Sequence, residues 1–156
     1  MMNKGLRYLA QGAVIAALYA ALTLLFAPIS YGLMQVRISE ALCVLPMFTP
    51  AAVPGLFVGC LLANLLGGAA VYDVVFGSLA TLAAAFLTRK LRFNRFLAPL
   101  PAVLVNGLVV GAMLAFLFDV GESFGACFLY ISAGQAIACY ALGIPLSYAL
   151  ERVRWE

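Results

Sequence analysis

The sequence predicts an all-α integral membrane protein with six transmembrane helices and both termini in the cytoplasm. Apolar residues make up 66% of the 156 residues and charged residues only 10%, whereas soluble domains carry about a quarter charged residues. The apolar residues form long runs without the alternation of barrel strands, so helices are the expected spanning elements. The basic residues also gather in stretches that six spans would place on one side of the membrane.

Six apolar segments follow one another in a single predicted domain, residues 1–156. The first has about 20 residues, enough to span a bilayer, and we expect it to be a retained helix and not a signal peptide. The second and third are too short to cross as straight helices. Either their prolines lie inside longer kinked helices, or the chain turns within protein-lined surroundings. The predicted segments cover residues 8–27, 38–48, 53–66, 73–88, 97–118 and 124–150.

The orientation follows from the distribution of the basic residues. With six spans and the N-terminus inside, all nine lysines and arginines except Arg37 face the cytoplasm. An odd number of spans would place the basic residues of one terminus outside. The cytoplasmic set comprises Lys4, Arg7, Arg89, Lys90, Arg92, Arg95, Arg152 and Arg154.

A small set of polar residues interrupts the predicted spans, and this topology places all of them at or above the midplane on the outer side. Polar groups within spans are costly and usually face a bundle interior or a cavity. Carboxylates accept hydrogen bonds and amides both donate and accept them, which suits a heterocycle with a mixed hydrogen-bonding edge. We therefore predict an outward-opening binding pocket formed by Arg37, Glu40, Asn64, Tyr72, Asp73, Asn106 and Gln135.

Each of these residues also has a structural interpretation. Arg37 and Glu40 are three residues apart and can pair at a helix end. Asp73 can be an N-cap. The three amides can form interhelical hydrogen bonds of roughly 0.6–2 kcal/mol each. The sequence leaves both interpretations open for any single residue, and the shared location favours binding.

Small residues recur every fourth position on the first segment. This spacing lets another helix approach closely, either within the bundle or from a partner protein. Two adjacent ridges follow the pattern, Gly12, Ala16 and Ala20 in one and Ala13, Ala17 and Ala21 in the other.

Catalytic, metal and nucleic-acid functions find no support in the sequence. Histidine is absent, and no P-loop, HExxH or GxSxG motif occurs. The four cysteines, at positions 43, 60, 127 and 139, form no Cys-x-x-Cys pair. No basic stretch interleaved with aromatic residues indicates a nucleic-acid surface. We expect a protein that is not an enzyme and needs no cofactor or metal.

The middle of the chain carries a distinctive series of motifs. These are QVRISEAL at 35–42, Leu45-Pro46, PGL at 54–56, Gly59-Cys60, Ala63-Asn64 and DVVFGSLAT at 73–81. The series resembles the QueT family of queuosine-precursor transporters, which are substrate-binding S components of energy-coupling factor transporters.

The resemblance implies a multi-pass protein of the cell membrane with a six-helix bundle. It implies a 7-deazaguanine substrate such as prequeuosine or queuine, a transmembrane coupling subunit and two cytoplasmic ATPase subunits. In this family the first helix presents its small residues to the coupling subunit, and the connection at 28–36 covers the site. Two alternatives stay open: a self-contained facilitator or channel made by oligomerisation, and an S component for another vitamin.

Overall fold

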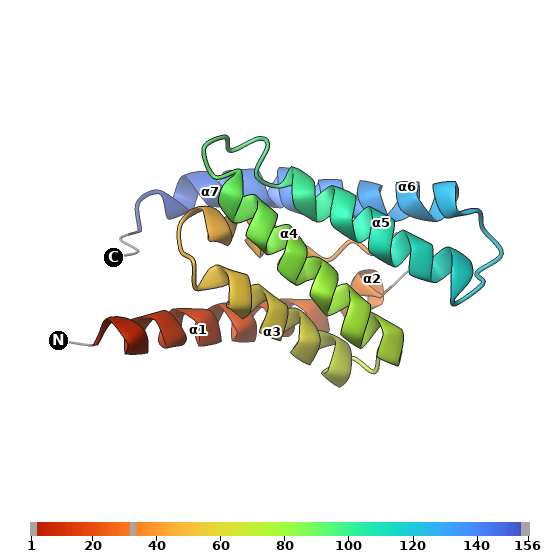
Figure 1. Ribbon diagram of the computed structural model, residues 1–156, viewed down its shortest axis with the longest axis horizontal. Helices are drawn as coiled ribbons and strands as arrows, with labels where there is room; N and C mark the ends of the chain where they lie inside the picture. The colour runs from red at the N-terminus through yellow and green to blue at the C-terminus, as the bar shows by residue number, and fades with distance from the viewer. Residues whose placement is uncertain (1–2, 32–33, 154–156) are drawn as a thin grey trace.

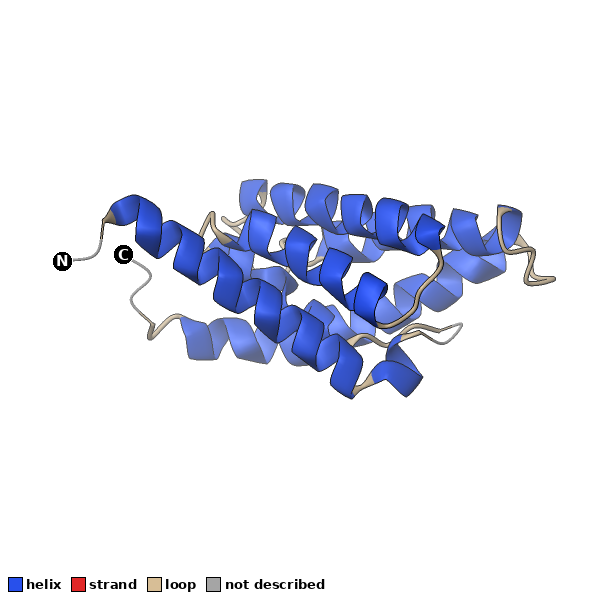
Figure 2. Cartoon of the chain, turned by 90° about the horizontal axis from the view of Figure 1, so that it is seen from below, coloured by secondary structure: helices blue, strands red, loops and turns tan. Residues whose placement is uncertain are grey.

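The computed structural model describes residues 3–31 and 34–153, and every regular element in this part of the chain is helical (Figure 1, Figure 2). Seven α-helical segments are joined by one 3-10 helix and two π-helical stretches within these residues. The all-α prediction is confirmed. In chain order the elements are α1 (Lys4–Leu25), α2 (Ala27–Ser30), η1 (Ile38–Met47), α3 (Ala52–Leu66), η2 (Asp73–Gly77), α4 (Ser78–Lys90), α5 (Leu100–Phe116), α6 (Phe124–Ala136), η3 (Ile137–Leu142) and α7 (Gly143–Leu150).

The observed helices coincide with the six predicted segments. Asn3 caps the first one, since its side chain accepts a hydrogen bond from the Gly5 amide. The sixth segment is continuous from Phe124 to Leu150, with η3 between α6 and α7. The predicted connection at 28–36 begins with the short helix α2, because Pro28 fits a first helical turn. In the described residues, the helices Lys4–Leu25 and Phe124–Leu150 are long and apolar enough to cross a membrane.

The central element is the 3-10 helix η1, whose residues from Ser39 to Pro46 are all buried. Its side chains contribute to two hydrophobic clusters: Leu42 and Leu45 pack with α1 and α3, and Cys43 and Val44 pack with α4, α5 and η3. A 3-10 helix rises about 2.0 Å per residue against 1.5 Å in an α-helix. The ten residues of η1 therefore extend further through the core than an α-helix of the same length.

Helices α1 and α3 pack at very short range because glycines line their contact. A Cβ built at Gly55 would lie 2.8 Å from the Gly12 carbonyl oxygen, and one at Gly59 would lie 2.9 Å from that of Ala16. Ala16 and Ala20 are accordingly buried. Of the two ridges predicted on α1, the one formed by Gly12, Ala16 and Ala20 thus faces α3 within the chain.

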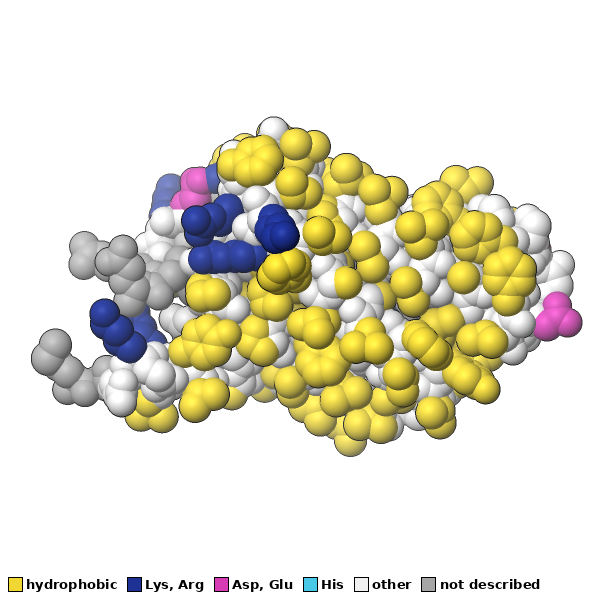
Figure 3. Space-filling model, viewed as in Figure 1, with side chains coloured by type: hydrophobic (Ala, Val, Ile, Leu, Met, Phe, Trp, Pro, Cys, Tyr) yellow, Lys and Arg dark blue, Asp and Glu magenta, His cyan; other side chains and the backbone are white. Residues whose placement is uncertain are grey.

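Basic side chains gather at the end of the molecule where α1 begins, α7 ends and α4 connects to α5, and apolar side chains cover the visible face beyond them (Figure 1, Figure 3). The α4–α5 connection is held against the last helical segment at this end. Arg95 pairs with Glu151 and lies over the Tyr148 ring, 3.9 Å from its centroid. The Tyr140 hydroxyl donates to the Phe96 carbonyl oxygen at 2.9 Å.

Candidate functional site

A buried polar network connects η1 with α2, α3 and η2. Arg37 precedes η1 and is only 6% exposed. Its guanidinium donates to the Ser30 carbonyl oxygen at 3.1 Å and to Asn64 Oδ1 at 3.0 Å. The Asn64 amide in turn donates to the Asp73 carbonyl oxygen at 3.0 Å. Residues far apart in the sequence are therefore joined by one chain of hydrogen bonds.

Glu40 forms the second part of the network. Its carboxylate is 3% exposed, accepts a hydrogen bond from the Tyr19 hydroxyl of α1 and has the Gln135 side chain of α6 as a hydrogen-bond neighbour. The adjacent Ser39 hydroxyl lies 2.6 Å from Thr23 Oγ1. A charge so deeply buried is costly unless polar groups surround it, and Tyr19 and Gln135 supply them.

Arg37 and Glu40 do not form the ion pair that their spacing permits. Among the described residues the one ion pair joins Arg95 to Glu151. Arg37 is committed to Ser30 and Asn64, and Glu40 is committed to Tyr19. The two side chains therefore stay separate inside the bundle, each with its own hydrogen-bond partners.

Irregular helical geometry accompanies the polar residues. Glu40 lies in the 3-10 helix η1, Asp73 begins the π-helical stretch η2, and Gln135 lies two residues before the π-helical stretch η3. The Cys139 Sγ atom in η3 lies 3.6 Å from the Glu40 carbonyl oxygen, so η3 packs directly on the start of η1. Such distortions re-aim side chains and are frequent at functional sites.

The structure brings four of the seven predicted site residues together by side-chain contacts: Arg37 with Asn64, and Glu40 with Gln135. Asp73 joins through its carbonyl oxygen, and its half-buried carboxylate is close enough to Arg37 to interact with it electrostatically. The charged residues of the predicted pocket thus lie in one region.

Two predicted residues lie apart from these contacts. Tyr72 is 50% exposed, and its ring meets the Phe118 ring edge to face, with centroids 6.3 Å apart. Asn106 is buried on α5 and takes no part in the hydrogen bonds of the network.

The sequence analysis missed Tyr19 and Thr23 of α1. Both are fully buried, and Thr23 also donates to the Tyr19 carbonyl oxygen at 2.9 Å. They are spaced by four residues, which places them on one face of the first helix. This polar pair in an otherwise apolar run was the signal that could have revealed them.

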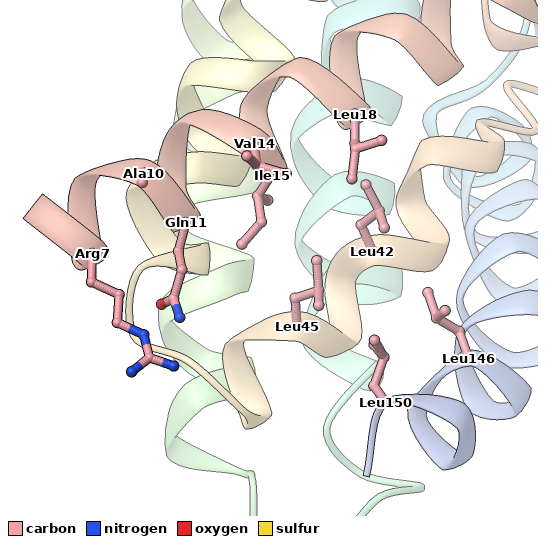
Figure 4. A pocket seen from close by; sticks show the side chains of 10 residues that line it. All are labelled: Arg7, Ala10, Gln11, Val14, Ile15, Leu18, Leu42, Leu45, Leu146 and Leu150. Carbon is pink, nitrogen blue, oxygen red and sulfur yellow. The ribbon is translucent and has the colours of Figure 1, made fainter. Parts of the chain in front are cut away.

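A separate apolar groove of about 430 Å³ lies between α1, η1 and α7 (Figure 4). Leucine, isoleucine and valine side chains of the three elements form its walls, and Arg7 lies at one end. A second groove of about 210 Å³ runs between α1 and α3 over Gly12, Ala13 and Gly55. Neither groove is lined by the residues of the polar network.

Comparison with known proteins identifies the family of the chain. The family model described as QueT transporter matches residues 9–152, nearly the whole chain. No curated protein and no solved structure matches the chain. With the two apolar helices of membrane length, the family match makes this a membrane transporter protein. The resemblance seen in residues 35–81 is confirmed, and the chain belongs to the QueT transporter family.

Proposed function

We propose that the chain is the S component of an energy-coupling factor transporter and captures a 7-deazaguanine from outside the cell. The observation that carries the proposal is the buried network of Arg37, Glu40, Asn64 and Gln135 in an otherwise apolar transporter protein. Burying these polar groups for structure alone would be costly, whereas a polar ligand can form hydrogen bonds with them.

The charges of the network fit a cationic deazaguanine. A guanine-like edge offers a ring N–H and an exocyclic amine side by side, and one carboxylate can accept both. Glu40 is the first candidate for this role. When Arg37, Glu40 and Asp73 are all ionised, one cation faces two anions. The excess negative charge suits the aminomethyl cation of prequeuosine, which Asp73 can meet.

The amides complete the proposed recognition. Gln135 lies next to Glu40, and Asn106 is a further buried amide, on α5. Both can donate to the carbonyl oxygen or accept from ring N–H groups. We propose that Asn106 turns toward the ligand and that Tyr72, directly before η2, contacts it on entry.

The proposed topology is six spans with both termini in the cytoplasm. The support is the common location of the α1 start, the α7 end and the α4–α5 connection at one basic end of the molecule (Figure 1, Figure 3). Cytoplasmic connections of membrane proteins carry this excess of lysine and arginine. The opposite end then faces outward.

The proposed partners are a transmembrane coupling subunit and two cytoplasmic ATPase subunits. The ridge of Ala13, Ala17 and Ala21 is exposed on α1, whereas the neighbouring ridge of the same helix packs against α3. Apolar grooves border α1 on both sides near its basic start (Figure 4). A helix of the coupling subunit can lie along this ridge and insert side chains into the grooves.

Calorimetric titration of the purified chain in detergent tests the binding function. We expect saturable binding of prequeuosine, weaker binding of the uncharged nitrile precursor, and no binding of riboflavin or thiamine. Tighter binding of one of the vitamins would assign the S component to another substrate. Uptake into liposomes by the chain alone would contradict the need for a coupling module and indicate a facilitator.

A further inference from the structure

The C-terminal end of η1 receives an arginine side chain from α4. Arg89 is half-buried near the end of α4, and its Nη1 atom donates to the Pro46 carbonyl oxygen at 2.9 Å and to the Met47 carbonyl oxygen at 3.2 Å. The last carbonyl groups of a helix lack partners within the helix, and a cation there also meets the negative end of its dipole. Arg89 therefore holds the last turn of η1 against α4.

This last turn has little support from the hydrogen bonds of η1 itself. Pro46 lies inside the helix and has no backbone N–H, so it cannot donate to the carbonyl group three residues earlier. The Phe48 and Thr49 amides both donate to the Leu45 carbonyl oxygen, at 2.9 and 3.1 Å. The position of this end of η1 consequently depends on the side chain that α4 supplies.

The other end of η1 carries the carboxylate of the polar network. Glu40 precedes Pro46 by six residues, which corresponds to about 12 Å along a 3-10 helix. All residues between them are buried, and Cys43 and Val44 pack against α4, α5 and η3. Close-packed interiors transmit strain, so a shift of one end of η1 displaces the other.

The end of α4 from which Arg89 extends is itself fixed. The neighbouring Thr88 is fully buried, and its hydroxyl donates to the Ala98 carbonyl oxygen at 2.8 Å. This bond ties α4 to its connection with α5 at the basic end of the molecule (Figure 1). Arg89 thus links η1 to an anchored part of the bundle.

We propose that Arg89 is a positioning residue for the ligand site: by holding the C-terminal end of η1, it sets the position of Glu40 and hence the affinity for the ligand. This inference deepens the proposed binding function and rests on it. Arg89 acts through η1 and touches no ligand itself. Small displacements matter, because binding groups must be held within about 0.5 Å of their productive geometry.

The first measurement follows the Glu40 carboxylate without ligand. Glutamate labelled with ¹³C at Cδ gives carboxyl signals for the four glutamates of the chain, and Glu40→Gln identifies one of them by its disappearance. Tyr19→Phe removes the hydrogen bond to Glu40 directly and provides a reference displacement of the signal. We expect Arg89→Gln to displace the Glu40 signal. The matched control Arg92→Gln, which removes the same charge from an exposed side chain, should leave it in place.

The second measurement is calorimetric titration with prequeuosine. We expect Arg89→Gln to weaken binding by about tenfold and Arg92→Gln to leave it within about twofold of wild type. Arg89→Lys keeps the charge, but its ammonium group lies one bond closer to the backbone than Nη1. It should therefore displace the Glu40 signal less than glutamine does and weaken binding by about threefold.

An unchanged Glu40 signal in a folded Arg89→Gln protein would overturn the inference, whether or not prequeuosine binds. Wild-type affinity of that variant, or equal effects of Arg89→Gln and Arg92→Gln, would overturn it as well. A displaced signal with no prequeuosine binding to the wild type would support the role of Arg89 and contradict the proposed substrate. If Arg89→Gln does not fold, Arg89→Lys decides by the same signal, and a signal at the wild-type position would overturn the inference.

Discussion

Glu40 is the residue on which the proposed recognition depends most. Its carboxylate lies between Tyr19 of α1 and Gln135 of α6, and it has no ion-pair partner among the described residues. Hydrogen bonds to charged groups contribute about 1.5–3 kcal/mol net, roughly twice the value for neutral pairs. A ligand that donates two such bonds would therefore be held mainly by this side chain.

Glu40→Gln should weaken prequeuosine binding by roughly ten- to a hundredfold, since 1.4 kcal/mol corresponds to a factor of ten. Glutamine keeps the shape of the side chain but offers a donor where the ligand also donates. Calorimetric titration measures the effect. Tyr19→Phe is the matched control for the lost internal hydrogen bond. A dissociation constant within about twofold of wild type would remove Glu40 from the site and pass its role to Asp73.

At the scale of the elements, the contact between α1 and α3 depends on close approach of the two backbones. Gly55 and Gly59 let the backbones approach, and Tyr19 packs over Gly59, where an added Cβ would lie 2.7 Å from the Tyr19 Cβ. Close helix contact replaces the hydrophobic driving force that is missing between helices in lipid. The same contact positions the Tyr19 hydroxyl for Glu40.

Gly59→Ala should therefore destabilise the protein by about 1–3 kcal/mol, the usual cost of overpacking a core. Thermal unfolding in detergent, followed by circular dichroism, measures the change. Gly125→Ala is the matched control, because its Cβ meets open space. Equal thermal stability of Gly59→Ala and Gly125→Ala would contradict the prediction, because it would mean that α1 and α3 can move apart without loss of stability.

The two faces of α1 lead to opposite expectations for the same substitution. Ala17→Leu places a large side chain on the exposed ridge, so we expect normal ligand binding by the isolated chain and loss of uptake in the full transporter. Ala16→Leu enlarges a buried side chain, 5% exposed, against α3 and should lower stability and binding together. Full uptake by a folded Ala17→Leu variant would show that the coupling subunit contacts another surface of the chain.

At the scale of the whole molecule, charge is distributed along the long axis. The visible basic side chains lie at the end that holds the start of α1 and the α4–α5 connection, together with one acidic side chain, and a further acidic side chain is visible at the opposite end (Figure 1, Figure 3). The visible face between the two ends is largely apolar, as expected for a surface in contact with lipid (Figure 3). We therefore expect the orientation in the membrane to follow from the basic side chains that the folded bundle gathers at one end.

A cysteine at position 93 should resist impermeant thiol reagents in intact cells, because the proposed topology places residues 89–95 inside. Phe93 is 77% exposed, so Phe93→Cys is accessible once the cell is opened. The four native cysteines are buried and can be replaced by alanine in the background protein. Glu122→Cys, in the exposed α5–α6 connection, is the control that should react from outside. The reverse labelling pattern would invert the proposed topology.

Composition and hydrophobic runs were enough to predict the all-α class and the positions of six helical segments, because the cost of burying backbone in lipid leaves few alternatives. The motifs around residues 35–42 were enough to indicate the family. Most polar site residues could be named as well, since charged and amide groups are conspicuous in apolar helices.

Only the tertiary structure decided which of these groups meet. The spacing of Arg37 and Glu40 permitted a mutual pair, but Arg37 bonds instead to Asn64 and Glu40 to Tyr19, both from distant segments. The two ridges of small residues on α1 look equivalent in the sequence. The close contact with the glycines of α3 determines which of them is buried. Local sequence patterns specify the helices and which of their residues are buried. Hydrogen-bond partners across the bundle depend on how the helices pack together, and no single segment encodes that packing.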